Sequence, residues 1–507
     1  MPVARIVVDP AYTVGPLNRR LFGSFVEHLG RCVYDGIYEP GHPSADADGF
    51  RTDVMELVRE LGVTTIRYPG GNFVSGYRWE DGVGPREQRP KRLDLAWHSL
   101  ETNQVGLHEF AGWSSRVGAE PMLALNLGTR GVQEALDLLE YTNLAAGSAL
   151  AELRAANGSP DPFNVRMWCL GNEMDGPWQL GHRSAEDYGK IASQVAKAMR
   201  QMDPDLELVV CGSSNRLMPT FGAWERVVLE HTYDDVDFIS CHAYYEERDG
   251  DRGSFLASAV DMDAFIEAVI ATADAVKPAL RRSRTIDISF DEWNVWYSDR
   301  HNEGGGKITG IDNWPYAPRL LEDQYSVTDA VVVGSLLISL LKHADRVKAA
   351  CLAQLVNVIA PIMTEPGGPA WRQTIFYPFA ITARLARGTV LRLVIESPSY
   401  DTAVYGSVAL VDAVATLDDD TGGVAVFMVN RSLDAPTAVS IDISSLGLVH
   451  LGESITLADD DRNATNTLER PDRIVPAPNR SARIGNGVLT VELPAVSWTA
   501  LELIHPE

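Results

Sequence analysis

The strongest constraint on the fold is an alternation of short β-prone segments with helical ones between residues 17 and 384. Strands buried on both faces read as short apolar runs, whereas amphipathic helices place apolar residues at i, i+3, i+4 and i+7. Eight segments have the strand pattern: Leu21–Val26, Val63–Tyr68, Met122–Asn126, Val165–Leu170, Leu206–Cys211, Val236–Cys241, Thr285–Phe290 and Val347–Leu352. Helical patterns lie between them, and the clearest cover 53–61, 184–199, 262–276 and 325–341. This alternation predicts an α/β fold, a (β/α)₈ TIM barrel. A doubly wound open sheet is the alternative, but no GxGxxG motif opens a helix after the first strand.

After about residue 385 the pattern changes to strands alone, separated by clusters of Gly, Pro, Asp and Asn. The expected strands cover 404–410, 423–429, 438–443 and 488–493, and such spacing is typical of an all-β sandwich. The apolar segment Ala4–Val8 has no place in the barrel alternation, so we expect it to join the second unit. The predicted domains are therefore a barrel of residues 17–384 and a jelly-roll-like β-sandwich of residues 1–16 and 385–507.

Composition excludes several classes of partner. The 69 acidic and 44 basic residues give a net charge of −25, whereas nucleic acids and anionic membranes bind clustered Lys and Arg. The five cysteines are odd in number and form no CxxC pair, which predicts neither a disulfide framework nor a zinc site. The N-terminus lacks the apolar stretch of a signal peptide, and the apolar run Ala330–Leu341 is too short to cross a bilayer. We expect that run to be a buried core helix and the protein to be cytoplasmic.

Polar and aromatic side chains follow almost every predicted barrel strand. The clusters are Glu27-His28, Pro69–Asn72, Asn126, Asn172-Glu173, Ser213–Asn215, His242–Tyr244, Asp291–Trp293, and Gln354 with Asn357. The polarity of loops explains any one of them. Many together predict a binding site, because the carboxyl ends of barrel strands meet at one mouth. Neutral hydrogen-bonding side chains, with few Lys or Arg, suit an uncharged ligand rich in hydroxyl groups.

Two of these strands end in a glutamate, Glu173 after Gly171 and Glu292 after Phe290. A glycoside hydrolase requires two carboxyl groups, one to protonate the leaving oxygen and one to attack carbon. The flanking tryptophans are Trp168, Trp178, Trp293 and Trp296. Aromatic rings stack on sugar faces, although core packing explains any single one of these tryptophans more simply.

Other motifs give weaker signals. Gly70-Gly71 is not followed by the Lys-Ser or Lys-Thr of a phosphate loop. His242 lacks the spacing of a metal motif, so it has either an orienting, hydrogen-bonding role or a structural one. Cys241 lies in a strand, where a thiol is more simply a buried, inert filler than a nucleophile. We expect neither a metal nor a cofactor.

Four segments resemble the intracellular α-L-arabinofuranosidases of glycoside hydrolase family 51. They are GSFVEH (23–28), RYPGGNF (67–73), LGNEMDGPW (170–178) and DEWNVWY (291–297), and the likeness extends over nearly the whole chain. The resemblance implies a retaining, exo-acting enzyme that releases terminal non-reducing L-arabinofuranose from arabino-oligosaccharides such as arabinan or arabinoxylan fragments. It also implies a homo-oligomer, often a hexamer, and no cofactor.

The resemblance implies a role for individual residues. Glu173 matches the general acid/base, Glu292 matches the nucleophile, and Arg67 matches an arginine near that nucleophile. Positions that contact the sugar, the aglycone or the catalytic carboxylates are matched by Glu27, Asn72, Asn172, Tyr244, Gln354, Trp178 and Trp296. The loop Arg300–Pro318, with His301, Lys307 and Trp314, is where leaving-group preference is expected to differ.

Two rival functions stay open at this point. A related retaining β-xylosidase or endo-glucanase would use the same glutamate pair, because loops read ring size and linkage. A non-catalytic sugar-binding protein on the same barrel would have no need of two carboxylates in intact surroundings.

Overall fold

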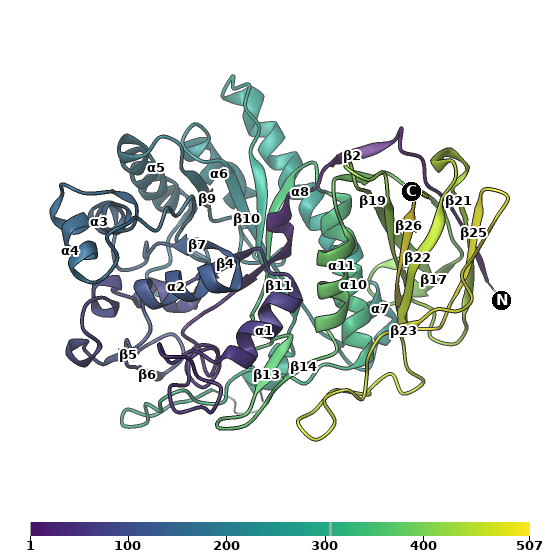
Figure 1. Cartoon of the computed structure of the whole chain (residues 1–507). Coiled ribbons are helices and arrows are strands. Elements are labelled where there is room, and N and C mark those ends of the chain that lie inside the picture. Colours follow the sequence, from purple (N-terminus) through teal and green to yellow (C-terminus); the bar gives the residue numbers. More distant parts are fainter. Residues whose placement is uncertain (1, 304–306, 507) are drawn as a thin grey trace.

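The computed structural model describes residues 2–303 and 307–506 (Figure 1). Eight parallel strands close into a barrel in the order β10-β11-β12-β3-β4-β7-β8-β9. Their bounds are β3 Gly23–Phe25, β4 Thr65–Tyr68, β7 Glu120–Ala124, β8 Met167–Leu170, β9 Glu207–Val210, β10 Phe238–Tyr245, β11 Asp287–Val295 and β12 Val347–Leu352. The predicted (β/α)₈ barrel is confirmed.

Helices follow the barrel strands and cover the barrel (Figure 1). They are α1 Thr52–Leu61, α2 Leu107–Val117, α3 Val132–Asn143, α4 Ala149–Ala156, α5 Ala185–Met202, α6 Ala223–Thr232, α7 Arg252–Leu256, α8 Ser258–Ala279, α9 Ser298–Glu303, α10 Val327–Lys342 and α11 Phe376–Leu385. The start of α5 shows why the sequence marks these boundaries well. The hydroxyl of Ser184 accepts a hydrogen bond from the backbone N–H of Asp187, which satisfies a donor that would otherwise lack a partner in the first turn.

Two barrel strands run further than the sequence predicts. The expected ends were Cys241 for β10 and Phe290 for β11, but the strands continue to Tyr245 and Val295. Polar residues mark a strand end only where they face water, and here the carboxylates are buried and have partners inside the barrel. His242 and Glu292 consequently lie side by side within paired strands, and do not lie in loops after them.

The β-sandwich consists of two sheets, β2-β15-β19-β20-β26-β22-β23 and β16-β1-β21-β25-β24. Their strands are β1 Val3–Val7, β2 Thr13–Pro16, β15 Thr389–Leu391, β16 Val394–Glu396, β19 Val411–Leu417, β20 Val424–Asn430, β21 Thr437–Asp442, β22 His450–Leu457, β23 Ala477–Pro478, β24 Arg483–Gly485, β25 Val488–Leu493 and β26 Ser497–Ile504. The first strand, β1, lies between β16 and β21, so the start of the chain is part of this unit.

Three short hairpins complete the sheet structure, namely β5–β6 (Arg92–Asp94, Ser99–Glu101), β13–β14 (Ile362–Thr364, Ala370–Arg372) and β17–β18 (Ser399–Thr402, Gly406–Ala409). The expectation of one strand over 404–410 is wrong. That segment contains the turn and second strand of β17–β18, and the sheet strand β19 begins only at Val411.

Helix α10 is buried along almost its whole length between the barrel and the β-sandwich (Figure 1). Gly334 faces the indole of Trp498 on β26, and a Cβ at this glycine would lie 2.2 Å from the ring. At the next residue of the helix, Ser335 accepts a hydrogen bond from Arg431 (2.9 Å), which also donates one to Asp412 (3.0 Å). The apolar run in the sequence is therefore explained by burial against two domains.

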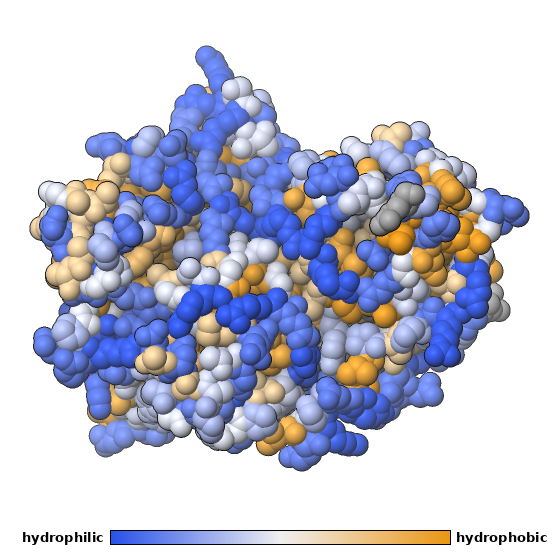
Figure 2. All heavy atoms as spheres, in the orientation of Figure 1, coloured by the Kyte–Doolittle hydropathy of each residue, from blue (hydrophilic) through white to orange (hydrophobic). Residues whose placement is uncertain are grey.

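The face of the molecule in Figure 2 is mostly hydrophilic, and its apolar residues gather in small groups over the β-sandwich side. Within residues 2–303 and 307–506, no helix combines the length and the apolarity that a bilayer-spanning segment requires.

The tight approach of Gly334 to Trp498 gives the first prediction. Gly334→Ala should lower the free energy of unfolding by about 1–3 kcal/mol, because the added methyl group must displace the indole in a packed interface. Thermal and urea unfolding measure the change. The matched control is Gly112→Ala on α2, where an added Cβ meets no atom within 4 Å and where we expect a gain of about 0.4–1 kcal/mol. A Gly334→Ala protein as stable as its Gly112→Ala counterpart would show that the two domains do not pack tightly here.

Candidate active site

A cavity of about 690 Å³ lies at the carboxyl-terminal end of the barrel, and residues of the barrel strands and of the segments after them form much of its wall. These include Phe25, Glu27, Glu173, Tyr244, Glu292 and Gln354. Asn72, Trp178 and Trp296 line it as well, so six of the seven residues expected to bind substrate lie at its wall. Asn172, Arg67 and His242 do not line the cavity. Arg67 and His242 contact the lining residues Glu292 and Glu173, and Asn172 accepts a hydrogen bond from Arg67.

Glu292 projects from β11 and is held by two donors. Its Oε1 accepts a hydrogen bond from Nη1 of Arg67 on β4 at 2.7 Å, and its Oε2 accepts one from the hydroxyl of Tyr244 on β10 at 2.8 Å. Nη2 of Arg67 donates to Oδ1 of Asn172, also at 2.7 Å. The guanidinium is 1% exposed and lies over the ring of Phe25. One buried cation therefore fixes the positions of two side chains from different strands.

Glu173 lies in the loop after β8, and its backbone is in the left-handed region with φ +43°. This conformation is costly for a residue with a side chain, and it is tolerated where surrounding contacts enforce it. Oε1 of Glu173 lies 2.9 Å from Nδ1 of His242, and Oε2 accepts a hydrogen bond from Nε1 of Trp178 at 2.6 Å. Both oxygens therefore have a partner in the free protein.

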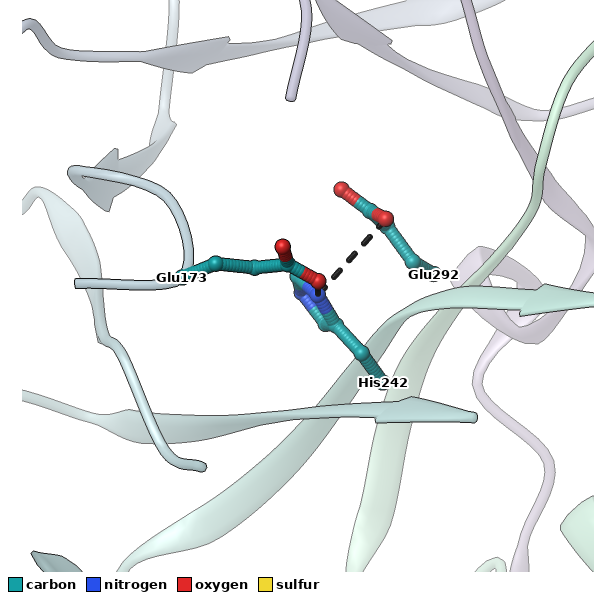
Figure 3. A group of neighbouring side chains, drawn as sticks. All are labelled: Glu173, His242 and Glu292. Atoms are coloured by element: carbon teal, nitrogen blue, oxygen red, sulfur yellow. Dashed lines mark hydrogen bonds and ion pairs between the residues drawn. The ribbon is translucent and has the colours of Figure 1, made fainter. Parts of the chain in front are cut away.

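The imidazole of His242 lies beside both glutamates (Figure 3). Its Nδ1 is 2.9 Å from Glu173 and 3.6 Å from Oε2 of Glu292, while its Nε2 is 2.8 Å from Oδ1 of Asp291. Burial lowers the pKa of His242, but the three surrounding carboxylates outweigh this effect and raise that pKa to about 10. The ring is therefore an imidazolium at neutral pH.

A β-bulge explains how neighbouring carboxylates reach the same ring. Successive residues of a regular strand point to opposite faces, so Asp291 would be expected to point away from Glu292. However, β11 has one extra residue opposite the stretch Ser240–His242 of β10. Its stretch Phe290–Trp293 likewise has one residue more than the part of β12 with which it pairs. The extra residue places both carboxylates inside the barrel. The sequence analysis named Asp291 only as part of a polar cluster, because a bulge has no signal in this sequence.

Glu27 is the centre of a second hydrogen-bonded group. Its Oε1 accepts bonds from the backbone N–H of Phe73 (2.9 Å) and from Nε1 of Trp97 (3.0 Å), and its Oε2 accepts one from Nε2 of Gln354 (3.0 Å). Burial raises the pKa of Glu27 to about 8, although the N–H donors favour its charged form. The sequence analysis missed Trp97, because this residue lies in the turn of hairpin β5–β6 and follows no barrel strand.

Two buried polar atoms near the cavity have no hydrogen-bond partner in the described chain. They are Oε1 of Gln354 and Nε1 of Trp296, whose indole packs edge-on against the ring of Tyr244. A buried polar group without a partner is costly, so these two atoms are suited to hydroxyl groups of a ligand.

The electrostatics separate the two glutamates. Burial raises the pKa of Glu173 above its ordinary value, and the negative charge of Glu292 adds to this effect, although the hydrogen bond from His242 opposes it. Glu292 instead forms an ion pair with Arg67. This environment favours a proton on Glu173, and it holds Glu292 against a permanent cation.

One oxygen of each glutamate and a ring nitrogen of His242 lie within 4.8 Å of one another, a spacing that could hold a metal ion. A metal ligand must offer a lone pair, which a histidine has only when neutral. Both nitrogens of His242 face carboxylate oxygens, and that arrangement favours a hydrogen-bonded imidazolium over a ligand set.

The loop Arg300–Pro318 is described only in part, because residues 304–306 lie outside the described residues. His301 and Lys307 line the cavity, and a part for them in leaving-group preference stays a prediction. Trp314 is not among the lining residues, and its ring stacks on His98 with centroids 3.8 Å apart.

Comparison with known proteins identifies close relatives. A family model for the α-L-arabinofuranosidase 1 domain matches residues 57–252, and one for the α-L-arabinofuranosidase C-terminal domain matches residues 291–497. An intracellular exo-α-(1→5)-L-arabinofuranosidase of Streptomyces lividans is 59% identical, over 100% of this chain and 76% of the relative. An exo-α-(1→6)-L-arabinofuranosidase of Bifidobacterium longum is 60% identical, over 99% of this chain and 97% of the relative.

Solved structures agree with these sequence matches. The family 51 α-L-arabinofuranosidase AbfB of Bifidobacterium longum superposes with a TM-score of 0.96 at 52% identity, over 100% of both chains. The α-L-arabinofuranosidase of Thermotoga maritima, in its arabinose complex, has a TM-score of 0.88 at 33% identity, over 99% of this chain and 100% of that one.

The buried ion pair between Arg67 and Glu292 gives the second prediction. Arg67→Met should lower the free energy of unfolding by about 3–5 kcal/mol, because it leaves a carboxylate buried without its cation. Adding Glu292→Gln to that variant should restore part of the loss, since no unpaired charge then remains. Urea unfolding of the wild type, both single variants and the double variant measures this coupling. Strictly additive effects would mean that the arginine does not stabilise the charge of Glu292.

Proposed function

Because the chain belongs to the α-L-arabinofuranosidases of glycoside hydrolase family 51, we propose that it releases terminal non-reducing L-arabinofuranose from arabino-oligosaccharides by a retaining double displacement. Exo-acting hydrolysis of α-L-arabinofuranosides is the activity named for its high-identity relatives. Those names give no support to a β-xylosidase, an endo-glucanase or a purely sugar-binding protein.

The observation that carries the mechanism is the closeness of the two carboxyl groups. One oxygen of Glu173 and one oxygen of Glu292 lie within 4.8 Å of each other. Retaining glycosidases hold these groups about 5–5.5 Å apart, whereas inverting enzymes leave about 6.5–9.5 Å so that a water molecule fits between them. The separation therefore supports direct attack by a carboxylate.

In the first step, a carboxylate oxygen of Glu292 attacks the anomeric carbon while the bond to the leaving oxygen breaks. Glu173 gives its proton to that oxygen, and the products are a neutral glycosyl ester and a Glu173 carboxylate. Arg67 and Tyr244 orient the attacking group through their hydrogen bonds to its two oxygens. Asn172 is held by Arg67 and does not line the cavity of the free protein. That it bonds the sugar 2-hydroxyl and so stabilises the oxocarbenium-like transition state stays a prediction.

In the second step, water attacks the anomeric carbon and gives a proton to Glu173. The ester bond breaks and its electron pair returns to Glu292. Glu173 can act as the base because its neighbour carries no charge in the intermediate, which removes one cause of its raised pKa.

The cavity wall supports a neutral, hydroxyl-rich substrate. Glu27, Asn72, Gln354 and Trp296 offer hydrogen-bonding groups, and Trp178 is half exposed at the wall, where an aglycone ring could stack. Relatives with nearly equal identity are named for (1→5) and (1→6) linkages. Overall identity to these relatives therefore does not assign a linkage preference to this chain.

Several expectations stay predictions within this proposal. The division into a barrel of 17–384 and a sandwich of 1–16 and 385–507 is supported by the pairing of β1 and β2 with C-terminal strands. A cytoplasmic location is supported by the word intracellular in the names of relatives. Assembly as a homo-oligomer and the lack of a cofactor rest on the family resemblance, and the lack of nucleic acid or membrane partners rests on the net charge.

The third prediction tests the activity and its nucleophile. The wild type should hydrolyse an aryl α-L-arabinofuranoside far faster than an aryl β-D-xylopyranoside, with or without a chelator. Glu292→Ala should lose about 10³-fold or more of kcat, because the attacking carboxylate is gone. Initial rates with both substrates measure this. Preference for the xyloside would change the substrate and keep the mechanism, whereas near-normal turnover by Glu292→Ala would remove Glu292 from its role.

The fourth prediction concerns pH. A general acid works only while protonated, and the raised pKa of Glu173 keeps its proton on to a higher pH than an ordinary glutamate would. For a poor leaving group, kcat/KM should fall as pH rises through that pKa. Glu173→Ala should lose this alkaline limb, and should lose far more activity with poor leaving groups than with good ones. A limb that persists in Glu173→Ala would have to come from another residue.

A further inference from the structure

Asp291 is a buried carboxylate next to the active site that takes no part in the two steps described above. It is 1% exposed, and its Oδ1 lies 2.8 Å from Nε2 of His242. Its Oδ2 lies 3.6 Å from the thiol of Cys169 and 4.0 Å from Nε of Arg67. Burying a carboxylate is expensive unless it is paired, so its position between two cationic groups requires an explanation.

The geometry around His242 restricts its protonation state. A neutral imidazole has one N–H and one lone pair. With the proton on Nε2, Nδ1 would present its lone pair to Glu173 and could take the proton that the acid must deliver to the leaving oxygen. With the proton on Nδ1, the lone pair of Nε2 would face the Asp291 carboxylate. An imidazolium satisfies both contacts.

We infer that Asp291 is a positioning residue that keeps His242 an imidazolium through both steps of the reaction. The hydrogen bond that Nδ1–H of His242 donates then shifts between Glu173 and Glu292, to whichever of them carries the negative charge. Nδ1 of His242 is 2.9 Å from the first and 3.6 Å from the second, so a small movement exchanges the partner. The inference rests on the proposed function.

The exchange keeps protons and electrons in balance. Before attack, Glu292 carries the charge and the Nδ1–H bond can point to it. When the ester forms and Glu173 gives up its proton, the negative charge moves to Glu173, and the Nδ1–H group of His242 donates its hydrogen bond to that carboxylate. Attack by water gives a proton to Glu173 and returns the electron pair to Glu292. Nδ1–H of His242 can then donate its hydrogen bond to Glu292 again. The imidazolium keeps both of its protons throughout.

The surrounding charges are consistent with this assignment. The groups that contact His242 or act on it electrostatically are Glu173 and Asp175 in the loop after β8, and Asp291 and Glu292 on β11. Arg67 on β4 and Cys169 on β8 act on Asp291, and Tyr244 on β10 bonds Glu292. Burial would raise the pKa of Asp291, but the charge of Arg67 and the bond from His242 hold it below its usual value. Asp291 therefore stays an anion across the working pH range, which in turn keeps the proton on Nε2.

Asp291→Asn tests the inference, because it preserves shape and removes the charge. With histidine labelled in ¹⁵N, both ring nitrogens of His242 should stay protonated in the wild type between about pH 5 and pH 9, and the ring should titrate in this range in Asp291→Asn. In kinetics with an activated aryl α-L-arabinofuranoside, the variant should lose about 10- to 100-fold of kcat. With a substrate whose leaving group is poor, and which therefore needs the acid, the alkaline limb of kcat/KM should move to higher pH in the variant, because Glu173 loses the cationic donor that lowers its pKa.

Two further variants separate charge from structure. Asp291→Glu restores the carboxylate and should recover the protonated ring and part of the rate. Asp329→Asn is the control, because Asp329 is also 1% exposed but lies in the cap of α10, where it accepts a hydrogen bond from the hydroxyl of Tyr297. This variant should leave both the ring spectrum and the alkaline limb unchanged.

The inference is overturned if both nitrogens stay protonated in Asp291→Asn, or if the ring titrates there while kcat and the alkaline limb do not change. If Asp291→Asn does not fold, the wild-type spectrum decides, because titration of the ring within the stated range contradicts the inference. The ring spectrum needs no substrate. A protein that does not hydrolyse arabinofuranosides would therefore disprove the proposed function and still give a reading on His242.

Discussion

The site depends on the buried guanidinium of Arg67, which bonds the nucleophile candidate Glu292 and the amide of Asn172. Without this cation, a carboxylate inside the barrel would pay the cost of burial by taking up a proton, and a protonated acid cannot attack carbon. The arginine comes from β4, whereas its two partners follow β8 and lie in β11, so the ion pair forms only when the barrel closes. Folding and the charge state of the nucleophile are therefore coupled.

A second constraint acts on the other side of the nucleophile. The bulge in β11 places Asp291 and Glu292 inside the barrel together, where both reach His242. The core then holds two permanent cations, Arg67 and the imidazolium, among three carboxyl groups. With Asp291 and Glu292 ionised the charges balance, and a proton on Glu173 keeps them balanced. The charge balance is also maintained in the covalent intermediate, because the negative charge that Glu292 loses appears on Glu173.

The β-sandwich contributes rigidity, and the residues that line the cavity come from the barrel side of the chain. Helix α10 lies against strands β19, β20 and β26 on one side and against α8 and α11 on the other. The glycine at its centre allows the indole of Trp498 to approach the helix backbone. Packing of this density resists displacement, which suits a site whose acid and nucleophile must stay close together.

The sequence by itself determined the barrel, the sandwich strands β1, β20, β21 and β25, and the two glutamates that follow or end apolar runs, because these depend on local patterns: apolar periodicity, capping, and carboxylates after apolar runs. It also indicated most of the cavity wall, since the strands of a barrel bring their carboxyl ends to one mouth. Only the tertiary structure decided that β10 and β11 continue past His242 and Glu292, that a bulge turns Asp291 inward, and that Trp97 reaches Glu27 from a hairpin. Each of these depends on which residues pair across strands or meet across the cavity, and no local pattern in the chain encodes such contacts.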